Sequence, residues 1–418
     1  MTFNWKRISS VVFGLILLLG LLAACGGGGD DKPAGGDSGG GDSGGSSDGD
    51  RKVVIGGLDT ITGPSSDTGA SYAKGREDYF NFLESSGGID GVSIEFKHQD
   101  YRYDMQEAQR TYQQFRDRDN AIGILGWGTG DTEALRQQIV TDEIPFISAS
   151  YSENLKNIDE SPYNFFTAAS YSDQGRAILK YILDNHEGSD APTVALFYPD
   201  NGFGHSPIQD MKDYAEEIGV EIVDEQIVDL DATEAQSQLL NMKKKNPDYG
   251  IIQETWGAAA TILRDAQTAG IETQFFGLNQ AVGEGIIEIA GDVSEGYMGA
   301  LVSAFPYEDF PGIEDYKNFI EESGRDWDEL DVYHIQGWVA GQVMAEGIKN
   351  AAEATDGEIT GADLREGLEA ISEMDLGGLQ PDLTFTDELH AGTSQIRIGI
   401  VKDGKWEAIS DDYVSSED

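Results

Sequence analysis

Short apolar runs alternate with helix-length amphipathic segments along most of this chain, and this alternation restricts the fold more than any other feature. From residue 52 the order is strand, helix, strand, helix, and a second series of the same kind starts near residue 170. Strands that alternate with helices in this way form parallel sheets covered by helices. The sequence therefore predicts an α/β fold with two lobes, each a doubly wound parallel sheet.

The expected strands fall into two sets. Those of the first set are Val53–Leu58, Val92–His98, Ala121–Leu125 and Ile144–Ser148, and those of the second are Val194–Tyr198, Glu221–Val228, Tyr249–Gln253 and Gln274–Gly277. Residues Ile313–Ile371 are expected to be mainly helical, and Ser394–Val401 and Trp406–Ile409 to form a hairpin. Ligands bind outside the carboxyl ends of parallel strands, so two facing sheets would place a site in the cleft between them.

The first 50 residues have a different character. Lys6 and Arg7 precede an apolar run, Val11–Leu22, which is shorter than the about 20 residues that span a bilayer. A basic start, a short apolar core and small residues before a cleavage site are typical of a secretory signal. Residues 26–50 are mostly Gly, Ser and Asp, which cannot bury enough surface to offset the entropy of ordering. They predict a flexible tether.

The only cysteine, Cys25, follows Leu-Ala-Ala directly. This arrangement resembles the lipobox of bacterial lipoproteins. The resemblance implies cleavage before Cys25 and a lipid on its sulfur. Residues 1–24 are then a lipoprotein signal peptide, and residues 25–51 a lipid-anchored linker. The protein is expected to be held at the membrane on the extracytoplasmic side, in the periplasm or at the cell surface.

Acidic residues dominate the charge of the chain. Because Lys6 and Arg7 lie in the signal, the mature chain keeps 26 of the 28 Lys and Arg and all 76 Asp and Glu, a formal charge of −50. Phosphate binding needs a basic surface, so this charge excludes nucleic acid as a partner. The acids are spread over every predicted helix without a calcium-loop pattern, which favours a surface adapted to high salt over a cation-binding protein.

Residue types suited to catalysis are not grouped in useful patterns. The histidines lie far apart and outside any H-E-x-x-H pattern; they are His98, His186, His205, His334 and His390. From residue 52 onwards the chain has no G-x-S-x-G elbow, and acylation of Cys25 would leave no free thiol. The sequence therefore predicts that the protein is not an enzyme and uses no metal or cofactor.

Several segments carry a family resemblance through their order and spacing. They are IGGLDTITGPSSDTG (residues 55–69), SSGGIDG (85–91), PDNGFGHS (199–206), LRDAQTAGI (263–271) and FFGLNQ (275–280). Together they resemble type I periplasmic binding proteins, the leucine/isoleucine/valine-binding group that feeds ABC transporters. The resemblance runs from Val53 to Ile409. It implies a monomer that closes around a small-molecule solute and docks on an ABC permease in the membrane.

The resemblance also implies how the chain divides. Three hinge crossings are expected near Ala168, Leu301 and Asp382. The N-lobe would comprise residues 52–168 and 302–381, and the C-lobe residues 169–301 and 382–410, followed by an acidic tail at 411–418.

The same resemblance places candidate ligand-binding residues at strand ends. In the N-lobe they are Trp127, Thr129, Asp131, Thr132, Ser150 and Tyr151, and in the C-lobe Phe203, Glu254, Thr255, Trp256, Asn279 and Gln280. Tyr101 and Tyr103 are further candidates. The glycine-rich turn at 126–130, followed by a helix N-terminus, suits an anionic group. Asp131 has two open interpretations, a helix N-cap or a carboxylate that attracts a cation. Trp127 and Tyr151 are either walls of the site or ordinary packing.

One position departs from the family pattern. Amino-acid-binding members place a carboxylate where this chain has Asn279 or Gln280, and an amide cannot compensate a buried ammonium in the same way. Either Glu254 or Asp131 replaces that carboxylate, or the ligand carries no ammonium. The expected ligand is thus a branched-chain amino acid or a related amide, carboxylic acid or aromatic acid. The alternative function is a lipid-anchored ligand-sensing subunit of a signalling system.

Overall fold

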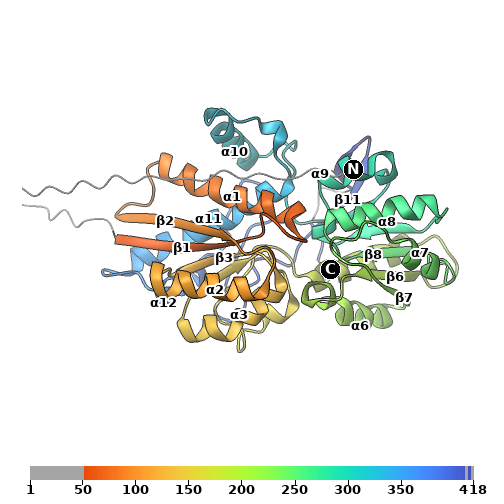
Figure 1. The fold of residues 1–418 in the computed structure, drawn as a ribbon, viewed down its shortest axis with the longest axis horizontal. Coiled ribbons are helices and arrows are strands. Elements are labelled where there is room, and N and C mark those ends of the chain that lie inside the picture. Colours follow the sequence, from red (N-terminus) through yellow and green to blue (C-terminus); the bar gives the residue numbers. More distant parts are fainter. Residues whose placement is uncertain (1–50, 410–412, 416–418) are drawn as a thin grey trace, which may run out of the picture. The chain divides into compact units, whose positions relative to one another are not determined.

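The structure, a computed structural model, describes residues 51–409 and 413–415. These residues form two α/β lobes, each built on its own sheet, which confirms the expected fold class (Figure 1). The predicted signal peptide, Cys25 and nearly all of the linker lie outside the described residues. Arg51, expected in the linker, instead starts the first strand, and Val414 of the expected acidic tail pairs with Ile396.

The sheet of the N-lobe is fully parallel and has the order β2-β1-β3-β4-β5. Its strands are β1 (Arg51–Asp59), β2 (Val92–Asp100), β3 (Gly123–Gly126), β4 (Phe146–Ser148) and β5 (Asn164–Phe165). Its helices are α1 (Ser66–Ser85), α2 (Met105–Gln114) and α3 (Thr129–Asp142), joined by α10 (Pro311–Glu322), α11 (Val332–Ala354) and α12 (Gly361–Glu369). The central strand β1 is almost entirely buried, as its continuous apolar run predicts.

Helix α11 returns from late in the chain and packs on α1. Two glycines allow this contact. A Cβ atom on Gly75 would lie 2.1 Å from the backbone oxygen of His334, and one on Gly337 would lie 2.1 Å from that of Tyr72. Any larger residue at either position would push the two helices apart.

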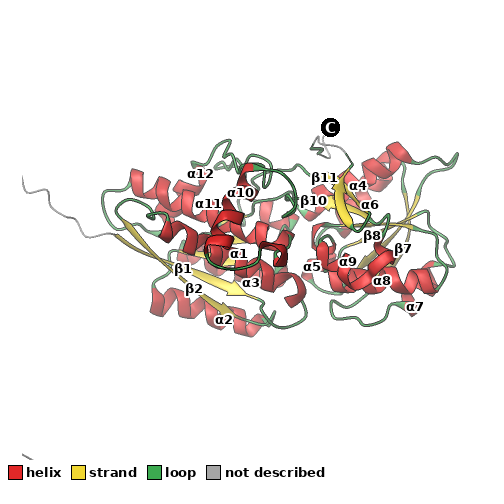
Figure 2. Ribbon diagram, turned by 90° about the horizontal axis from the view of Figure 1, so that it is seen from above, coloured by secondary structure: helices red, strands yellow, loops and turns green. Residues whose placement is uncertain are grey.

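The sheet of the C-lobe has the order β12-β11-β10-β9-β8-β6-β7. Its strands are β6 (Thr193–Tyr198), β7 (Glu221–Ile227), β8 (Tyr249–Ile252), β9 (Gln274–Gly277), β10 (Met298–Leu301), β11 (Arg397–Lys402) and β12 (Lys405–Ala408). Its helices are α4 (Tyr171–Asn185), α5 (Gly202–His205), α6 (Ile208–Ile218), α7 (Gln236–Met242), α8 (Trp256–Thr268) and α9 (Glu284–Ala290). Strand β11 pairs antiparallel with both β10 and β12, so this sheet is parallel only in part. Figure 2 shows helices packed around both sheets.

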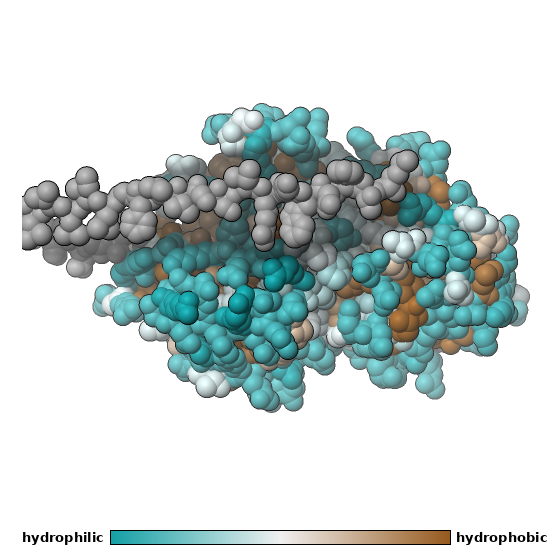
Figure 3. All heavy atoms as spheres, in the orientation of Figure 1, coloured by the Kyte–Doolittle hydropathy of each residue, from teal (hydrophilic) through white to brown (hydrophobic). Residues whose placement is uncertain are grey.

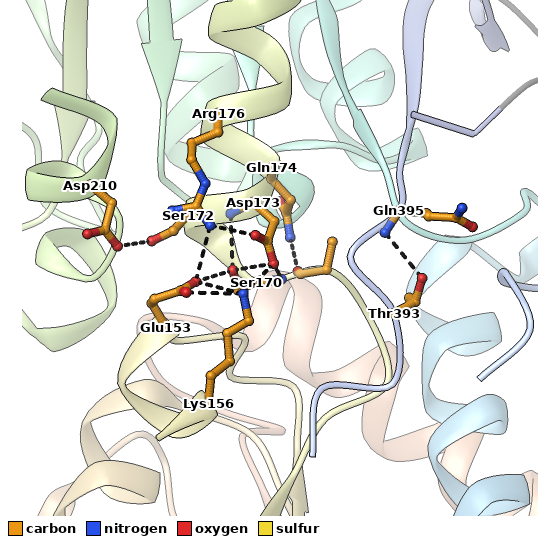
Figure 4. Close-up of polar contacts among 11 residues, drawn as sticks. Glu153, Lys156, Ser170, Ser172, Asp173, Gln174, Arg176, Asp210, Thr393 and Gln395 are labelled. Atoms are coloured by element: carbon orange, nitrogen blue, oxygen red, sulfur yellow. Dashed lines mark hydrogen bonds and ion pairs between the residues drawn. The ribbon is translucent and has the colours of Figure 1, made fainter. Parts of the chain in front are cut away.

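The chain passes between the sheets after β5, after β10 and before β11. A charged network joins the two sides of the first passage (Figure 4). Lys156 Nζ lies 3.0 Å from Glu153 and 2.8 Å from Asp173 on α4, and Arg176 also contacts Asp173, at 2.5 Å. Burial alone would raise the pKa of Asp173, but Lys156, Ser170 and Arg176 outweigh it and hold the pKa below its ordinary value. The network ties a 3-10 turn of the N-lobe to the first turn of α4. The predicted lobe boundaries remain a prediction.

On the face seen in Figure 3, hydrophilic residues cover most of the visible surface. Among the residues with described positions, no helix has both the length and the apolar character needed to cross a membrane. The adaptation to high salt that the acidic composition suggests stays a prediction.

A histidine is buried where the third passage meets the N-lobe. His390 is 1% exposed and stacks on Phe165, with ring centroids 3.8 Å apart. Its Nε2 lies 3.0 Å from Glu369 Oε1, yet burial is the larger effect and lowers the pKa of His390 to about 4. The ring is therefore neutral in the folded protein at neutral pH.

This burial predicts a pH dependence of stability. The unfolded chain protonates His390 near pH 6.5 and the folded protein only near pH 4, so its contribution is complete above 6.5 and is lost as the pH falls towards 4. Urea unfolding of wild type and His390→Gln at pH 7.5 and 5.5 should give a difference in unfolding free energy that shrinks at pH 5.5. An equal difference at the two pH values would contradict the assignment.

Candidate functional site

A cavity lies at the carboxyl ends of strands from both lobes. Nearly every residue that lines it follows a strand closely in the sequence. The lining residues are Ser65, Tyr103, Trp127, Gly128, Thr129 and Ala149 from the N-lobe, and Tyr171, Phe203, Leu230, Thr255 and Gln280 from the C-lobe. This is where open parallel sheets bind ligands.

The start of α3 forms one polar wall of the cavity. Gly128 is the N-cap residue and has no side chain, so it cannot accept a hydrogen bond from the first backbone N–H groups of the helix. The Ser150 hydroxyl donates to Thr129 Oγ1 at 2.8 Å. A Cβ atom on Gly128 would lie 2.5 Å from the Tyr103 ring, so only glycine fits there. The wall combines hydroxyls with a helix N-terminus, which suits an anionic group.

Aromatic rings form the apolar walls. The indole N–H of Trp127 donates to Ser65 Oγ at 3.0 Å, and its ring packs 5.2 Å from that of Tyr72. Across the cavity, Tyr171 and Phe203 meet edge to face with ring centroids 5.4 Å apart. These contacts hold the rings in place and leave little freedom for rearrangement.

Asp131 lies behind the polar wall. Because α3 begins at Thr129, Asp131 sits in the first helical turn and not at the N-cap. Its Oδ1 accepts a hydrogen bond of 2.7 Å from the Tyr101 hydroxyl. Burial raises the pKa of Asp131 to about 7, although hydrogen bonds from Tyr101 and the backbone oppose this shift. Its contacts are those of a residue that supports the turn.

Glu254 is the most unusual side chain of the site. It is fully buried, and neither carboxyl oxygen has a hydrogen-bond partner in the described part of the chain. Burial, followed by the nearby Asp229 and Asp67, raises its pKa well above the ordinary value. Glu254 is next in the chain to Thr255, which lines the cavity.

The cavity supplies no counter-ion for this carboxylate. None of the eleven lining residues is Lys or Arg. A buried carboxylate without a partner is costly, so a cationic group of a ligand would find a strong partner in Glu254.

The structure brings the predicted site residues together, although to different degrees. Those that line the cavity are Trp127, Thr129, Phe203, Thr255 and Gln280. The others are buried but not part of the lining: Asp131, Thr132, Ser150, Tyr151, Glu254, Trp256 and Asn279. Tyr151 packs against Phe166 and Tyr171, with ring centroids 6.0 and 5.8 Å away. Ligand contact by any of these residues remains a prediction.

The candidate set omitted several lining residues. They are Ser65, Gly128, Ala149, Tyr171 and Leu230. Gly128 and Ala149 belong to turns that the sequence had singled out. Ser65 and Leu230 follow strands, so the rule that ligands bind at the carboxyl ends of parallel strands could have identified them. Tyr171 follows the first passage and becomes part of the site only through the packing of the lobes.

Comparison with known proteins assigns the chain to a family. A model of the periplasmic binding protein family matches residues 52–405. A leucine-, isoleucine-, valine-, threonine- and alanine-binding protein of Pseudomonas aeruginosa is 22% identical over 308 residues, 72% of this chain and 79% of the relative. The chain therefore belongs to the periplasmic binding protein family. Its members bind small-molecule solutes outside the cytoplasm, work with a membrane permease and are not enzymes, which confirms the expected class.

Two solved structures share the fold at 28% sequence identity. A branched-chain amino-acid ABC transporter protein from Thermus thermophilus with bound valine has a TM-score of 0.81 over 87% of this chain and 96% of its own. An ABC transporter substrate-binding protein from Aeropyrum pernix has a TM-score of 0.80 over 86% and 95%.

The burial of Glu254 predicts that an uncharged substitute stabilises the protein without ligand. The unfolded chain ionises Glu254 near pH 4.5, while the folded protein resists ionisation, so the cost of this residue grows as the pH rises above 4.5. Glu254→Gln should raise the unfolding free energy by about 1–3 kcal/mol at pH 8 and by less at pH 5. The exposed Glu234→Gln is the matched control. A variant that is less stable than wild type at pH 8 would contradict the prediction.

Proposed function

We propose that this protein is the solute receptor of an ABC importer and that its ligand is an α-amino acid with an aliphatic side chain. The family assignment supports the receptor class. The observation that carries the choice of ligand is Glu254, a buried carboxylate with no partner among the described residues, beside a cavity without basic residues. A ligand with an ammonium group supplies the missing partner.

The rest of the cavity suits the other parts of such a ligand. The α-carboxylate binds at the start of α3, which has no capping side chain, beside the hydroxyls of Thr129 and Ser150. The aliphatic side chain lies among Trp127, Tyr171 and Phe203. Of the two carboxylates considered as substitutes for the missing family carboxylate, Glu254 is the better choice because both of its oxygens lack a hydrogen-bond partner among the described residues, whereas one oxygen of Asp131 accepts from the Tyr101 hydroxyl.

Calorimetric titration with matched compounds tests this assignment. Leucine, valine and isoleucine should bind, whereas 4-methylpentanoate, which is leucine without its ammonium, should bind at least about 100-fold more weakly. Glu254→Gln should weaken leucine binding by about 100-fold and leave the weak binding of 4-methylpentanoate unchanged. Glu234→Gln should bind leucine like wild type. Tighter binding of 4-methylpentanoate, an amide or an aromatic acid than of leucine would overturn the proposal.

The proposal includes a lipid anchor on Cys25, which lies outside the described residues. The support is the sequence around it, a short apolar segment that ends in Leu-Ala-Ala, and the acidic glycine-rich tether that follows. The anchor would keep the receptor near the permease while the tether lets it move.

Phase partitioning in a detergent tests the anchor. The protein isolated from its native membranes should enter the detergent phase, and Cys25→Ser should stay in the aqueous phase. Mass spectrometry should find an N-terminal lipid-modified Cys25. An unmodified Cys25, or an intact residue 1, in the membrane-isolated protein would rule the anchor out.

A further inference from the structure

Two carboxyl groups reach across between the lobes, and each meets the N-terminus of a helix in the other lobe. Asp67 on α1 of the N-lobe accepts from the N–H of Gly257 on α8 of the C-lobe, at 3.0 Å. Glu284 on α9 of the C-lobe accepts from the N–H of Val332 on α11 of the N-lobe, also at 3.0 Å. Neither residue lines the cavity. The contacts are reciprocal, because each lobe gives one acceptor and receives one.

The Asp67 contact replaces a cap that α8 lacks. The N-cap residue of α8, Thr255, makes no capping hydrogen bond with its side chain, so the first turn of α8 depends on the other lobe. The second carboxyl oxygen of Asp67 accepts from Thr68 on its own helix, at 3.0 Å. A Cβ atom on Gly257 would lie 3.0 Å from Asp67 Oδ2, so glycine leaves room for this approach.

The Glu284 contact completes the cap of α11. Asp331, the N-cap of α11, accepts from the N–H groups of Tyr333 and His334, while the N–H of Val332 is bonded to Glu284. Nearby, the Tyr333 hydroxyl donates to the backbone oxygen of Asn279 in the C-lobe at 2.9 Å. The N–H of Val332 at the start of α11 therefore has its hydrogen-bond partner only when the two lobes are together.

Separation of the lobes would break both contacts in the same motion. Each would return one helix N–H to water and one carboxyl group to solvent. Because ligand release requires separation, the strength of these contacts sets how much of the protein is closed at a given moment, and apparent affinity follows the closed fraction.

We propose that Asp67 and Glu284 form a reciprocal pair of closure latches that determine ligand affinity without touching the ligand. The effect on affinity rests on the proposed function, whereas the effect on closure does not. Both are positioning residues. They hold the N-termini of α8 and α11 against the opposite lobe and so favour the closed arrangement around the cavity.

Removal of either acceptor should weaken both latches, because the two contacts form and break with the same closure of the lobes. Asp67→Ala and Glu284→Ala remove the acceptors, and each should weaken leucine binding about tenfold. Asp67→Asn and Glu284→Gln keep an acceptor oxygen and should stay within about threefold of wild type. Gln is a close mimic because burial, with Asp331 as a second cause, raises the pKa of Glu284 to about 8, so its carboxyl group is mostly protonated at pH 7. Glu314→Ala, an exposed carboxylate in the first turn of α10, is the control.

Hydrogen–deuterium exchange separates a latch from a simple local cap. In Asp67→Ala, exchange should rise at the start of α8 and also at the start of α11, and Glu284→Ala should show the same pair. Gly257→Ala, which crowds Asp67 and leaves every carboxylate in place, should reproduce the Asp67→Ala pattern.

The outcomes distinguish the two proposals. Faster exchange confined to the helix next to each substitution, with leucine affinity within twofold of wild type, would overturn the latch. If leucine does not bind to wild type, the proposed function fails, and the exchange measured without ligand still decides whether the two helix starts open together.

Discussion

In a doubly wound sheet every helix that follows a parallel strand begins at the carboxyl edge, and in this protein such edges from both lobes meet at one cavity. Helix N-termini carry unpaired N–H groups and a partial positive charge, so their convergence needs acceptors. The acceptors that the chain provides are carboxylates and hydroxyls. Asp131 supports the start of α3, and Asp67 and Glu284 meet the starts of α8 and α11. The acidic character of the region follows from this geometry as much as from the composition of the chain.

Several of the few basic residues of the chain form ion pairs away from the cavity lining. Arg76 is buried against Asp59, Lys156 and Arg176 contact Asp173 at the first passage between the lobes, and Arg397 contacts Glu308 at 2.7 Å. These cations neutralise carboxylates that hold the framework. None lines the cavity, so Glu254 lacks a protein counter-ion there.

The sequence predicted the long, periodic elements well. The structure confirms the α/β class, and the predicted strand Gln274–Gly277 and the hairpin near the C-terminus are present. The shortest elements were missed, among them β5 with two residues, α9 and β10, because a few residues carry too little periodicity. The glycine-rich residues 126–130 were expected to form a turn before the helix, whereas α3 already begins at Thr129, since glycines at 128 and 130 concealed the first helical turn. That shift moved Asp131 from the N-cap into the helix.

By itself the sequence determined the two-lobe α/β fold, the turns that carry candidate residues and the absence of a carboxylate at Asn279 and Gln280. These follow from local patterns, since strand runs, glycines and residue types at strand ends are all read along the chain. Only the tertiary structure showed that Asp131 accepts a hydrogen bond from Tyr101, whereas neither oxygen of Glu254 has a hydrogen-bond partner among the described residues, because pairing and burial depend on neighbours distant in sequence. It alone revealed the contacts of Asp67 with Gly257 and of Glu284 with Val332, which are 190 and 48 residues apart, because helix starts from different lobes become neighbours only when both sheets are folded and packed together.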